Sequence, residues 1–392
     1  MSDGAESAAL AVAIVGSGPA GFYCADALSR LSTQARIHIY ERLPQPYGLL
    51  RYGVAPDHLA TKSLSRVFAR VMQRPRMRFF GNVTVGTDIS LSSLEDAYDA
   101  VIVAAGAAEG RRLGIVRDPA CLSGTALDFA HWFNGHPHAR ALPAHRPIRH
   151  VCIVGNGNVS LDVARVLARP NDMLQRLGVP LPPLQWHKSL DLKEIRIVGR
   201  SVATQTRFSP AELRALAGLD GFRPVVCQAD VSLREEKTNE CLQVLREWAS
   251  APIGTGRPIR FSFGMVPERQ TTNSLICRDA SDRIHEFDCD LLIEAIGQLP
   301  ARVAGLAFEP ASGAVPHERG LVHGRKATFV AGWSAGRQLN IPLIREEARE
   351  LSERIVKQIA PAGLRGNSKV DQLVRALPSC VVTWTDLSNA AA

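Results

Sequence analysis

Short apolar runs alternate along the chain with stretches whose apolar residues recur at helical spacing. The first run, residues 11–15, stops at the glycine-rich segment 16–21, and apolar residues then recur every three or four positions as far as Leu31. A second apolar run, residues 36–40, follows and ends at Glu41. This order predicts a strand, a tight turn, a helix and a second strand, which together form the βαβ unit of a parallel sheet.

The same pattern returns further along the chain. The run 151–154 leads into the glycine-containing segment 155–160 and then into a predicted helix. One face of that helix is expected to carry Val159, Val163, Val166 and Leu167. Each copy is followed later by an apolar strand that ends in small residues, at 99–106 and at 290–297. The repetition predicts an α/β fold with two Rossmann-like dinucleotide-binding domains.

The rest of the pattern is less regular. A proline-rich stretch between residues 168 and 193 is predicted to be a loop insertion, which delays the next strand of the second copy to 195–198. A last strand at 328–331 is followed by a helix from Arg345 to about Ile359. The final thirty residues, from Pro361, show no clear pattern.

Length and composition limit the class of protein. The 392 residues are too many for one ordinary core and fit two domains. With 46% hydrophobic and 21% charged residues, the chain has the composition of a folded globular protein. Its N-terminal apolar run is too short to cross a bilayer, and Asp3 and Glu6 are the wrong charge for a secretory or transit signal, so we expect a cytoplasmic location.

Cysteine spacing and net charge further limit the classes of function that are possible. The eight cysteines include no CxxC pair, which argues against a compact iron–sulfur motif, a zinc ribbon or a redox dithiol. Cys152 and Cys289 lie in apolar runs and are expected to be buried and inert. The net charge of +8 is not gathered in one block, so nucleic acid is not favoured. An acidic protein, a phosphate-bearing ligand or plain solvation of the surface would each account for this charge.

The first glycine segment carries the chemistry of a nucleotide site. In such a turn Gly16 makes the bend, Gly18 lets backbone amides approach a pyrophosphate, and Gly21 lets the helix pack closely on the strand. The positive end of the helix then faces the phosphates. Glu41 is placed to accept hydrogen bonds from a ribose and would repel a 2′-phosphate, which favours FAD or NAD.

The second copy has the opposite polarity. Arg200 stands after the strand 195–198, where the first copy has its carboxylate, and a cation there suits the extra phosphate of NADP. A flavin and a nicotinamide in one chain indicate hydride transfer, in which the cofactors carry the chemistry and the protein positions them.

Several motifs resemble one family. They are the segments 15–21, 47–58 with Lys62, 78–83, 132–134, 155–165, 198–200, 212–214 and 332–333. In these motifs the chain is similar to the adrenodoxin-reductase-like ferredoxin–NADP reductases, within the glutathione-reductase-type flavoproteins. The resemblance runs from about residue 11 to about residue 360.

The resemblance implies a discontinuous FAD-binding domain, residues 1–110 and 322–392, with an NADP-binding domain, residues 111–321, inserted into it. It implies that NADPH reduces FAD, which passes electrons to a ferredoxin-type iron–sulfur protein, and a basic surface would suit an acidic carrier. His58 is the expected catalytic residue, near the flavin. The expected cofactor-binding residues are Gly16, Gly18, Pro19, Ala20, Gly21, Glu41, Arg42, Gly48, Leu49, Val83, Ala105, Gly106, Asn156, Gly157, Asn158, Val159, Arg200, Glu212, Gly332, Trp333, Asn340 and Ile341.

The chain departs from the family pattern at three places. The second of two adjacent arginines is Ser201, for which Arg207 could substitute. A second acid after Glu212 is replaced by Ala215. The segment 334–342 lacks the family's Gly-Pro-x-Gly and carries the bulky Arg337 and Leu339.

These departures leave two alternatives open. One is a diverged flavoenzyme, an oxidase or monooxygenase acting on a small molecule, and the other is a protein that uses the flavin structurally. Two interpretations with purely structural roles also stay open. His58 could be a loop histidine bonded to backbone, and Glu212 could only compensate the start of a helix after Ser209 and Pro210. The histidines at 131, 136, 138, 145 and 150 lack the spacing of one helix face, so no metal is expected.

Overall fold

The computed structural model describes residues 9–142, 146–231, 239–252, 254–337, 340–359, 364 and 368–390. His145, Leu339 and most of the segment 360–367 lie outside these residues. The chain forms two compact units. Unit 1 comprises Met1–Arg51, Ala60–Glu109 and Leu299–Ala392, and unit 2 comprises Tyr52–Leu59 and Gly110–Gln298.

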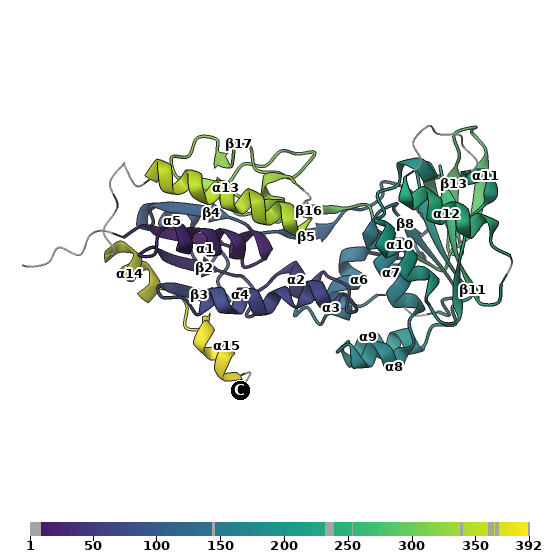
Figure 1. The fold of residues 1–392 in the computed structure, drawn as a ribbon, viewed down its shortest axis with the longest axis horizontal. Coiled ribbons are helices and arrows are strands. Elements are labelled where there is room, and N and C mark those ends of the chain that lie inside the picture. The colour runs from purple at the N-terminus through teal and green to yellow at the C-terminus, as the bar shows by residue number, and fades with distance from the viewer. Residues whose placement is uncertain are drawn as a thin grey trace, which may run out of the picture. The chain divides into compact units, whose positions relative to one another are not determined.

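An eight-stranded sheet forms the centre of unit 1 (Figure 1). Its strands lie in the order β17 (His317–Glu318), β18 (Leu321–Val322), β19 (Thr328–Val330), β4 (Ala100–Val103), β1 (Ala11–Val15), β2 (Arg36–Tyr40), β3 (Met77–Gly81) and β20 (Val382–Thr383). The five strands from β19 to β3 are parallel, and the strands at both edges are antiparallel. This parallel centre contains the predicted βαβ unit. Every residue of β1 and β4 is buried, as expected for parallel strands that are covered on both faces.

Helices cover the sheet of unit 1. They are α1 (Pro19–Leu31), α4 (Leu64–Met72), α5 (Leu91–Ala97), α13 (Ile341–Ile359), α14 (Ser368–Arg375) and α15 (Trp384–Ala390), with the short α2 (Leu49–Tyr52) and α3 (Leu59–Lys62) at the ends of the segment Tyr52–Leu59. The long α13 packs along α1, where Ser352 Oγ donates to the carbonyl of Cys24 at 3.4 Å. The sequence predicts this helix from Arg345, and in the structure it begins four residues earlier, at Ile341.

Unit 2 is built on a six-stranded parallel sheet. The order is β10 (Phe222–Val225), β11 (Arg257–Phe263), β9 (Glu194–Gly199), β8 (His150–Val154), β15 (Leu291–Glu294) and β7 (Leu122–Thr125). A second sheet contains β14 (Ile284–Asp288), β13 (Ser274–Arg278), β12 (Val266–Gln270) and β6 (Val116–Arg117). The helices are α6 (Ala126–Phe133), α7 (Asn158–Ala168), α8 (Asn171–Arg176), α9 (Leu181–Lys188), α10 (Pro210–Ala217), α11 (Gln228–Val231) and α12 (Glu240–Ser250). The prediction of two dinucleotide-binding sheets is thus confirmed.

The units differ from the predicted domains in two segments. Residues 299–321 pack with unit 1, because Ala301 donates to the carbonyl of Gly106 and β17 and β18 extend the sheet of unit 1. Residues 52–59 pack with unit 2, because Asp57 and His58 bind side chains of α7. The chain passes between the units at β5 (Ala107–Gly110) and β16 (Gln298–Pro300), which pair with each other.

One local prediction is wrong, and the structure adds detail at two further places. The proline-rich insertion contains the helices α8 and α9, because Pro170 and Pro180 stand at their N-caps, where the missing N–H is not needed. The C-terminal residues form α14, β20 and α15, although no pattern predicts them. Val159 is 44% exposed rather than buried with Val163, because it lies in the first turn of α7.

Two further observations concern predictions about cysteine and membranes. Cys152 and Cys289 are fully buried, as expected, and the neighbouring Cys289 thiol together with burial raises the pKa of Cys152. Among the described helices, none combines the length and the hydropathy that a bilayer span requires. The cytoplasmic location stays a prediction.

Candidate functional site

The turn between β1 and α1 has the form that the glycine motif predicts. Gly16 has a φ of +105°, and a Cβ there would lie 2.3 Å from the carbonyl oxygen of Ala104. A Cβ on Gly21 would lie 2.2 Å from the carbonyl oxygen of Gly16. A Cβ on Gly18, in contrast, would meet no atom within 4 Å. The outer two glycines are therefore required by the protein backbone, whereas the middle one faces open space where a ligand fits.

The N-terminus of α1 points its free amides at the same space. Gly18 is the N-cap, and no side chain among the described residues caps this helix. The first-turn N–H groups and the positive end of the helix dipole are therefore available to an anion. These features fit the pyrophosphate of a dinucleotide.

Glu41 lies at the end of β2 beside this turn. It is 7% exposed and accepts hydrogen bonds from Ser17 N at 3.0 Å, Ser17 Oγ at 2.6 Å and Leu43 N at 3.1 Å. A carboxylate has about four acceptor positions, so a further one remains for a ribose hydroxyl. The backbone of Val83 is joined to the same residue, since Val83 N donates to the Glu41 carbonyl at 2.9 Å.

A second loop closes over the glycine turn. Tyr47 N donates to the Ser17 carbonyl at 3.0 Å, and a Cβ on Gly48 would lie 3.2 Å from Gly18 Cα. Tyr47 adopts a φ of +89°, which is rare for a residue other than glycine and is held here by packing of its buried ring. The structure therefore brings Gly48 and Leu49 beside Gly18, as a shared cofactor site requires.

The remaining residues expected at FAD lie at the ends of β4 and β19, which are neighbours in the sheet. Ala105 N donates to Ser334 Oγ at 3.2 Å, and a Cβ on Gly332 would lie 2.9 Å from Ala20 Cβ. Gly106 faces open space, and Trp333 is half-buried. The structure thus gathers these residues around the same edge of the sheet as the glycine turn.

Arg42, Asn340 and Arg337 lie in this region but have different surroundings. Arg42 is exposed. The Asn340 Oδ1 accepts from Leu343 N at 3.1 Å, so this side chain supports the start of α13, which begins at Ile341. Arg337 Nη1 lies 3.8 Å from Glu347 on α13. Leu339 lies outside the described residues.

The turn between β8 and α7 repeats the first one in unit 2. Gly155 has a φ of +145°, and a Cβ there would lie 2.3 Å from the carbonyl oxygen of Ala295. Gly157 has open space where its Cβ would be, and no described side chain caps α7. Ser160 replaces the third glycine and fits because its Oγ donates to the Gly157 carbonyl at 2.6 Å. The Oδ1 of Asn156 is buried without a partner among the described residues, while its Nδ2 donates to the Ser201 carbonyl at 3.1 Å.

Two arginines stand near this second turn. Arg200 follows directly on β9 and is exposed. Arg207 is also exposed, and its N–H donates to the Asn156 carbonyl at 2.8 Å, so its backbone lies against the turn beside Gly157. The same segment is fixed by Ser209 N, which donates to Asn158 Oδ1 at 2.7 Å. These residues fit the phosphates of NADP.

His58 lies in unit 2 within a cluster of charged side chains. Its Nε2 is 2.7 Å from Asp162 Oδ1, 3.5 Å from Glu212 Oε2 and 2.6 Å from an Arg165 guanidinium nitrogen. Arg165, which is 3% exposed, also pairs with Asp57 and Glu212. The interpretation of His58 as a loop histidine bonded only to backbone is therefore wrong.

The charges of this cluster explain its protonation. Asp57, Asp162 and Glu212 carry three negative charges and Arg165 and Arg169 carry two positive charges, so one positive charge on His58 makes the cluster neutral. The hydrogen bond to Asp162 raises the pKa of His58 above its usual value, although burial opposes this. Burial raises the pKa of Asp57, but its hydrogen bonds and ion pairs with both arginines outweigh burial and lower it. The charges around His58 therefore favour its protonated form.

The sequence motifs indicate only two members of this cluster as site residues, His58 and Glu212. Asp162 and Arg165 stand three residues apart on α7, which puts both on one face of the helix, and this spacing was the available signal. Although Ala215 replaces the second acid, His58 still contacts two carboxylates. His58, Asp162 and Glu212 have the donor atoms for a metal ion, but the Arg165 guanidinium already contacts all three side chains. Ser209 accepts from Glu212 N at 3.4 Å, so the predicted N-cap is confirmed.

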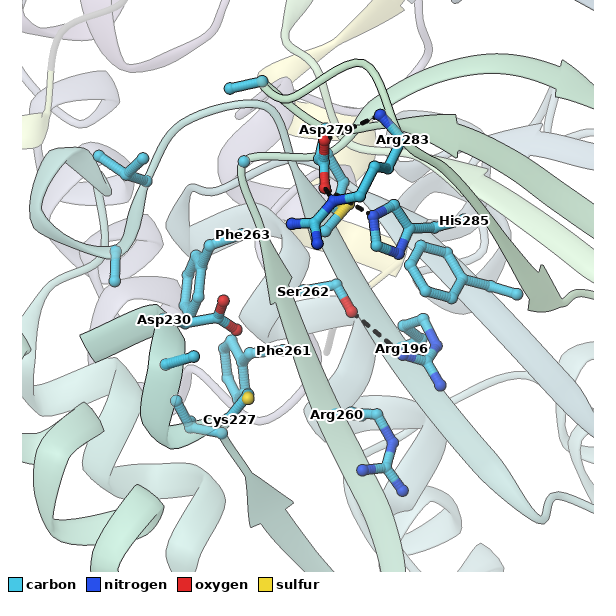
Figure 2. Close-up of a pocket in the computed structure, with 18 of the residues that line it drawn as sticks. Arg196, Cys227, Asp230, Arg260, Phe261, Ser262, Phe263, Asp279, Arg283 and His285 are labelled. Carbon is cyan, nitrogen blue, oxygen red and sulfur yellow. Dashed lines mark hydrogen bonds and ion pairs between the residues drawn. The ribbon is translucent and has the colours of Figure 1, made fainter. Parts of the chain in front are cut away.

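Unit 2 also contains a cavity that the sequence did not predict. It measures about 790 Å³ and lies at the carboxyl ends of β10 and β11 and against β14 (Figure 2). Among its lining residues, Asp279 accepts from Arg283 and His285, and Arg196 donates to the Ser262 hydroxyl at 3.1 Å. No residue of the glycine turn 155–160 lines this cavity, so it is separate from the expected NADP site.

Comparisons with known proteins agree with this geometry. A family model described as pyridine nucleotide-disulphide oxidoreductase matches residues 10–198. The chain is 32% identical to the NADPH-ferredoxin reductase FprA of Mycobacterium tuberculosis, covering 94% of this chain and 86% of that protein. It is 34% identical to the mitochondrial NADPH:adrenodoxin oxidoreductase of Arabidopsis thaliana, covering 81% and 74%.

The solved structure of Mycobacterium tuberculosis FprA in complex with NADPH has the same fold. It superimposes with a TM-score of 0.88 and 30% identity, covering 96% of this chain and 92% of that one. The two glycine turns at two parallel sheets, and a match along nearly the whole length of such relatives, show that the chain belongs to the family of NADPH-dependent ferredoxin and adrenodoxin reductases.

Proposed function

We propose that this protein oxidises NADPH and passes the electrons through FAD to a ferredoxin-type iron–sulfur protein. The observation that carries the proposal is the pair of glycine turns, at Gly18 and Gly157, each open to a ligand and each facing an uncapped helix N-terminus. Family membership then assigns the two nucleotides. FAD, when bound, accepts two electrons with a hydride and releases them one at a time.

The FAD site is proposed in unit 1. Gly16, Gly18 and Gly21 shape the turn, α1 binds the pyrophosphate, and Glu41 accepts from the ribose. The buried carboxylate of Glu41 would repel a 2′-phosphate, which excludes NADP from this turn. Residues 1–110 and 322–392 are the proposed FAD-binding domain, with the added observation that residues 299–321 pack in the same unit.

The NADP site is proposed in unit 2, within residues 111–321. Gly157 and the N-terminus of α7 face the pyrophosphate, and Asn156 offers its unpartnered acceptor. Arg200 and Arg207 supply the charge for the 2′-phosphate, so that Arg207 replaces the arginine missing at position 201.

His58 is proposed to act beside the reacting rings. The hydrogen bond between His58 Nε2 and Asp162 raises the pKa of His58 and so favours its protonated form. A fixed imidazolium provides positive charge and a donor without any rearrangement during the reaction. Arg165 donates to Asp162 Oδ1 at 2.6 Å and so holds in place the carboxylate that His58 contacts.

The electron acceptor is proposed to be an acidic carrier. The chain has a net charge of +8, and complementary charge accelerates the encounter of redox partners. The alternative acceptor is oxygen or another small molecule, for which the departure at Arg337 is the reason.

A stopped-flow experiment tests the function. The FAD-loaded protein is mixed anaerobically with NADPH or NADH, and the flavin absorbance is followed. The reduced protein is then mixed with an acidic [2Fe–2S] ferredoxin or with oxygen. We expect NADPH to bleach the flavin faster than NADH, and ferredoxin to restore the colour faster than oxygen does. No bleaching at millimolar NADPH contradicts the proposal, and fast reoxidation by oxygen alone supports the small-molecule enzyme instead.

A further inference from the structure

A run of positive charge follows the segment Tyr52–Leu59 and enters unit 1. Between Leu59 and Thr87 the chain has six Lys and Arg residues and no Asp or Glu. Four of these cations recur at every fourth residue along α3 and α4 and at the end of α4. We call Lys62, Arg66, Arg70 and Arg74 the basic stripe.

The spacing of the stripe is unfavourable for the helix itself. Residues four apart lie side by side on a helix, and like charges there repel one another. The two ends of the stripe are compensated, because Lys62 Nζ donates to the Arg51 carbonyl at 3.0 Å and Arg74 pairs with Asp26 at 2.5 Å. Arg66 and Arg70, in the middle, are exposed, and no described acidic side chain pairs with either.

The exposed face of α4 combines charge with an apolar centre. Phe68, Val71 and Met72 are buried under the helix, whereas Val67 is 47% exposed on the outer face. Val67 lies beside Arg66 and one turn from Arg70 in the helix. An apolar centre with a charged rim is the arrangement of a protein-binding surface.

The buried face of α4 leads directly to the proposed FAD site. Phe68 stacks on Phe22 of α1 with ring centroids 4.8 Å apart, and its ring lies 6.3 Å from that of Tyr47. Tyr47 precedes Gly48, which lies against the glycine turn at Gly18. The Arg51 guanidinium lies over the Tyr47 ring at 5.2 Å, and Arg51 is bound by Lys62 of the stripe. Phe68 and Tyr47 therefore link the buried face of α4 to the cofactor turn.

Two exposed arginines of unit 2 contrast with this surface. Arg214 pairs with Glu240 at 2.6 Å, and Arg278 pairs with Glu268 at 2.6 Å. Such pairs cancel the local field that would attract an acidic partner. Uncompensated charge next to the proposed flavin site is found at Arg66 and Arg70.

We propose that Arg66, Val67 and Arg70 form the centre of the docking surface for the acidic iron–sulfur carrier. The proposal rests on the proposed function, because it takes that carrier as the occupant. Each reduced flavin supplies two electrons and each carrier takes one, so two carriers must bind and leave in every cycle. Exposed charge suits this requirement, since it raises association rates without the large apolar area that would slow release.

The test reverses the charge at the centre of the stripe. The double variant Arg66→Glu/Arg70→Glu is compared with Lys369→Glu/Arg375→Glu, which makes the same change in net charge on exposed residues of α14. Each holoprotein is assayed with NADPH and an acidic [2Fe–2S] ferredoxin over a range of salt concentrations. Each is also assayed with ferricyanide, a small acceptor that needs no protein docking and that reports whether the folded FAD and NADPH sites are intact.

We expect the stripe variant to lose at least tenfold in kcat/KM for ferredoxin at low salt, with a weaker dependence on salt, while its ferricyanide rate stays within twofold of wild type. The α14 variant should keep both rates within about twofold. Equal losses in the two variants, or no loss in the stripe variant, would overturn the docking surface. Failure of the proposed function is separate, because the wild-type protein itself would then reduce ferricyanide but no ferredoxin.

Discussion

Arg165 and Asp57 form a buried ion pair, with Arg165 Nε 2.6 Å from Asp57 Oδ2 and side chains only 3% and 6% exposed. The pair joins α7, the helix of the second glycine turn, to the segment Tyr52–Leu59. This segment packs in unit 2 although the residues on both sides of it belong to unit 1. The same ion pair therefore holds His58, the next residue after Asp57, in the site.

Removing one partner of this ion pair should destabilise unit 2. We expect Arg165→Met to lower the free energy of unfolding by about 1–3 kcal/mol, because the buried Asp57 loses one of its two arginine partners and keeps only Arg169. Arg214→Met is the control, since Arg214 and Glu240 are half exposed and such a pair contributes about 0–1 kcal/mol. Urea unfolding followed by circular dichroism measures both. Equal losses in the two variants would show that the buried pair has no special role.

The protonation of His58 should depend on Asp162. The hydrogen bond that Asp162 accepts from His58 is the largest cause of the raised pKa of His58. Asp162→Asn should therefore lower that pKa. NMR titration of the imidazole resonances measures this pKa. Asp172→Asn is the control, because Asp172 is an exposed partner of Arg176 and should leave His58 unchanged. An unchanged His58 pKa in Asp162→Asn would refute the assignment.

The same shift predicts how stability depends on pH. A histidine whose pKa is higher in the folded state stabilises the protein fully below its unfolded pKa of about 6.5, and this stabilisation is lost as pH rises through the folded pKa. The difference in free energy of unfolding between wild type and His58→Gln should therefore shrink as pH rises above about 6.5. Urea unfolding at a series of pH values measures it. A difference that grows with pH would mean that His58 is neutral in the folded protein.

How far the sequence predicts this fold depends on the range of the interactions. The strands at 11–15 and 151–154 and the turns after them follow from local patterns, because burial on both faces demands continuous apolar runs and a tight turn demands glycine. The helices α8 and α9 were missed, since proline at an N-cap and proline in a loop look alike until the following residues are seen to pack.

Long-range electrostatics account for what the sequence did not predict in the site. The contact between Asp57 and Arg165 spans 108 positions, and no periodic pattern connects them. Likewise, Arg207 stands near the second turn because its backbone binds Asn156, 51 positions away. Such pairs arise from the topology of the sheet, so the motif shows which residue types are present but not which of them meet.

Gly18 and Gly21 of the first turn should respond differently to an added methyl group. Gly21→Ala places a Cβ against the carbonyl of Gly16, so we expect loss of stability without FAD as well as with it. Gly18→Ala has free space in the protein, so the apoprotein should keep its stability while FAD binds at least tenfold more weakly, about 1.4 kcal/mol. Thermal unfolding of the apoprotein and fluorescence titration with FAD separate these effects. An unstable Gly18→Ala apoprotein would show that this space is not reserved for the cofactor.

The two arginines of the second turn should determine the choice of coenzyme. Both are exposed, so their removal should cost little stability; the backbone of Arg207 pairs with Gly157, and Arg200 follows directly on β9. We expect Arg200→Ala to raise the KM for NADPH by ten- to a hundredfold, because a charge-assisted contact with the 2′-phosphate is lost, and to change the KM for NADH by less than threefold. Arg207→Ala should show the same selectivity if Arg207 takes the place of the arginine missing at Ser201. Steady-state kinetics with ferricyanide as acceptor measures both coenzymes in each variant, and Arg140→Ala, at another exposed arginine of unit 2, is the control. Loss of selectivity in Arg200→Ala alone would assign the 2′-phosphate to a single cation, and equal losses for NADPH and NADH would mean that these arginines bind the shared pyrophosphate instead.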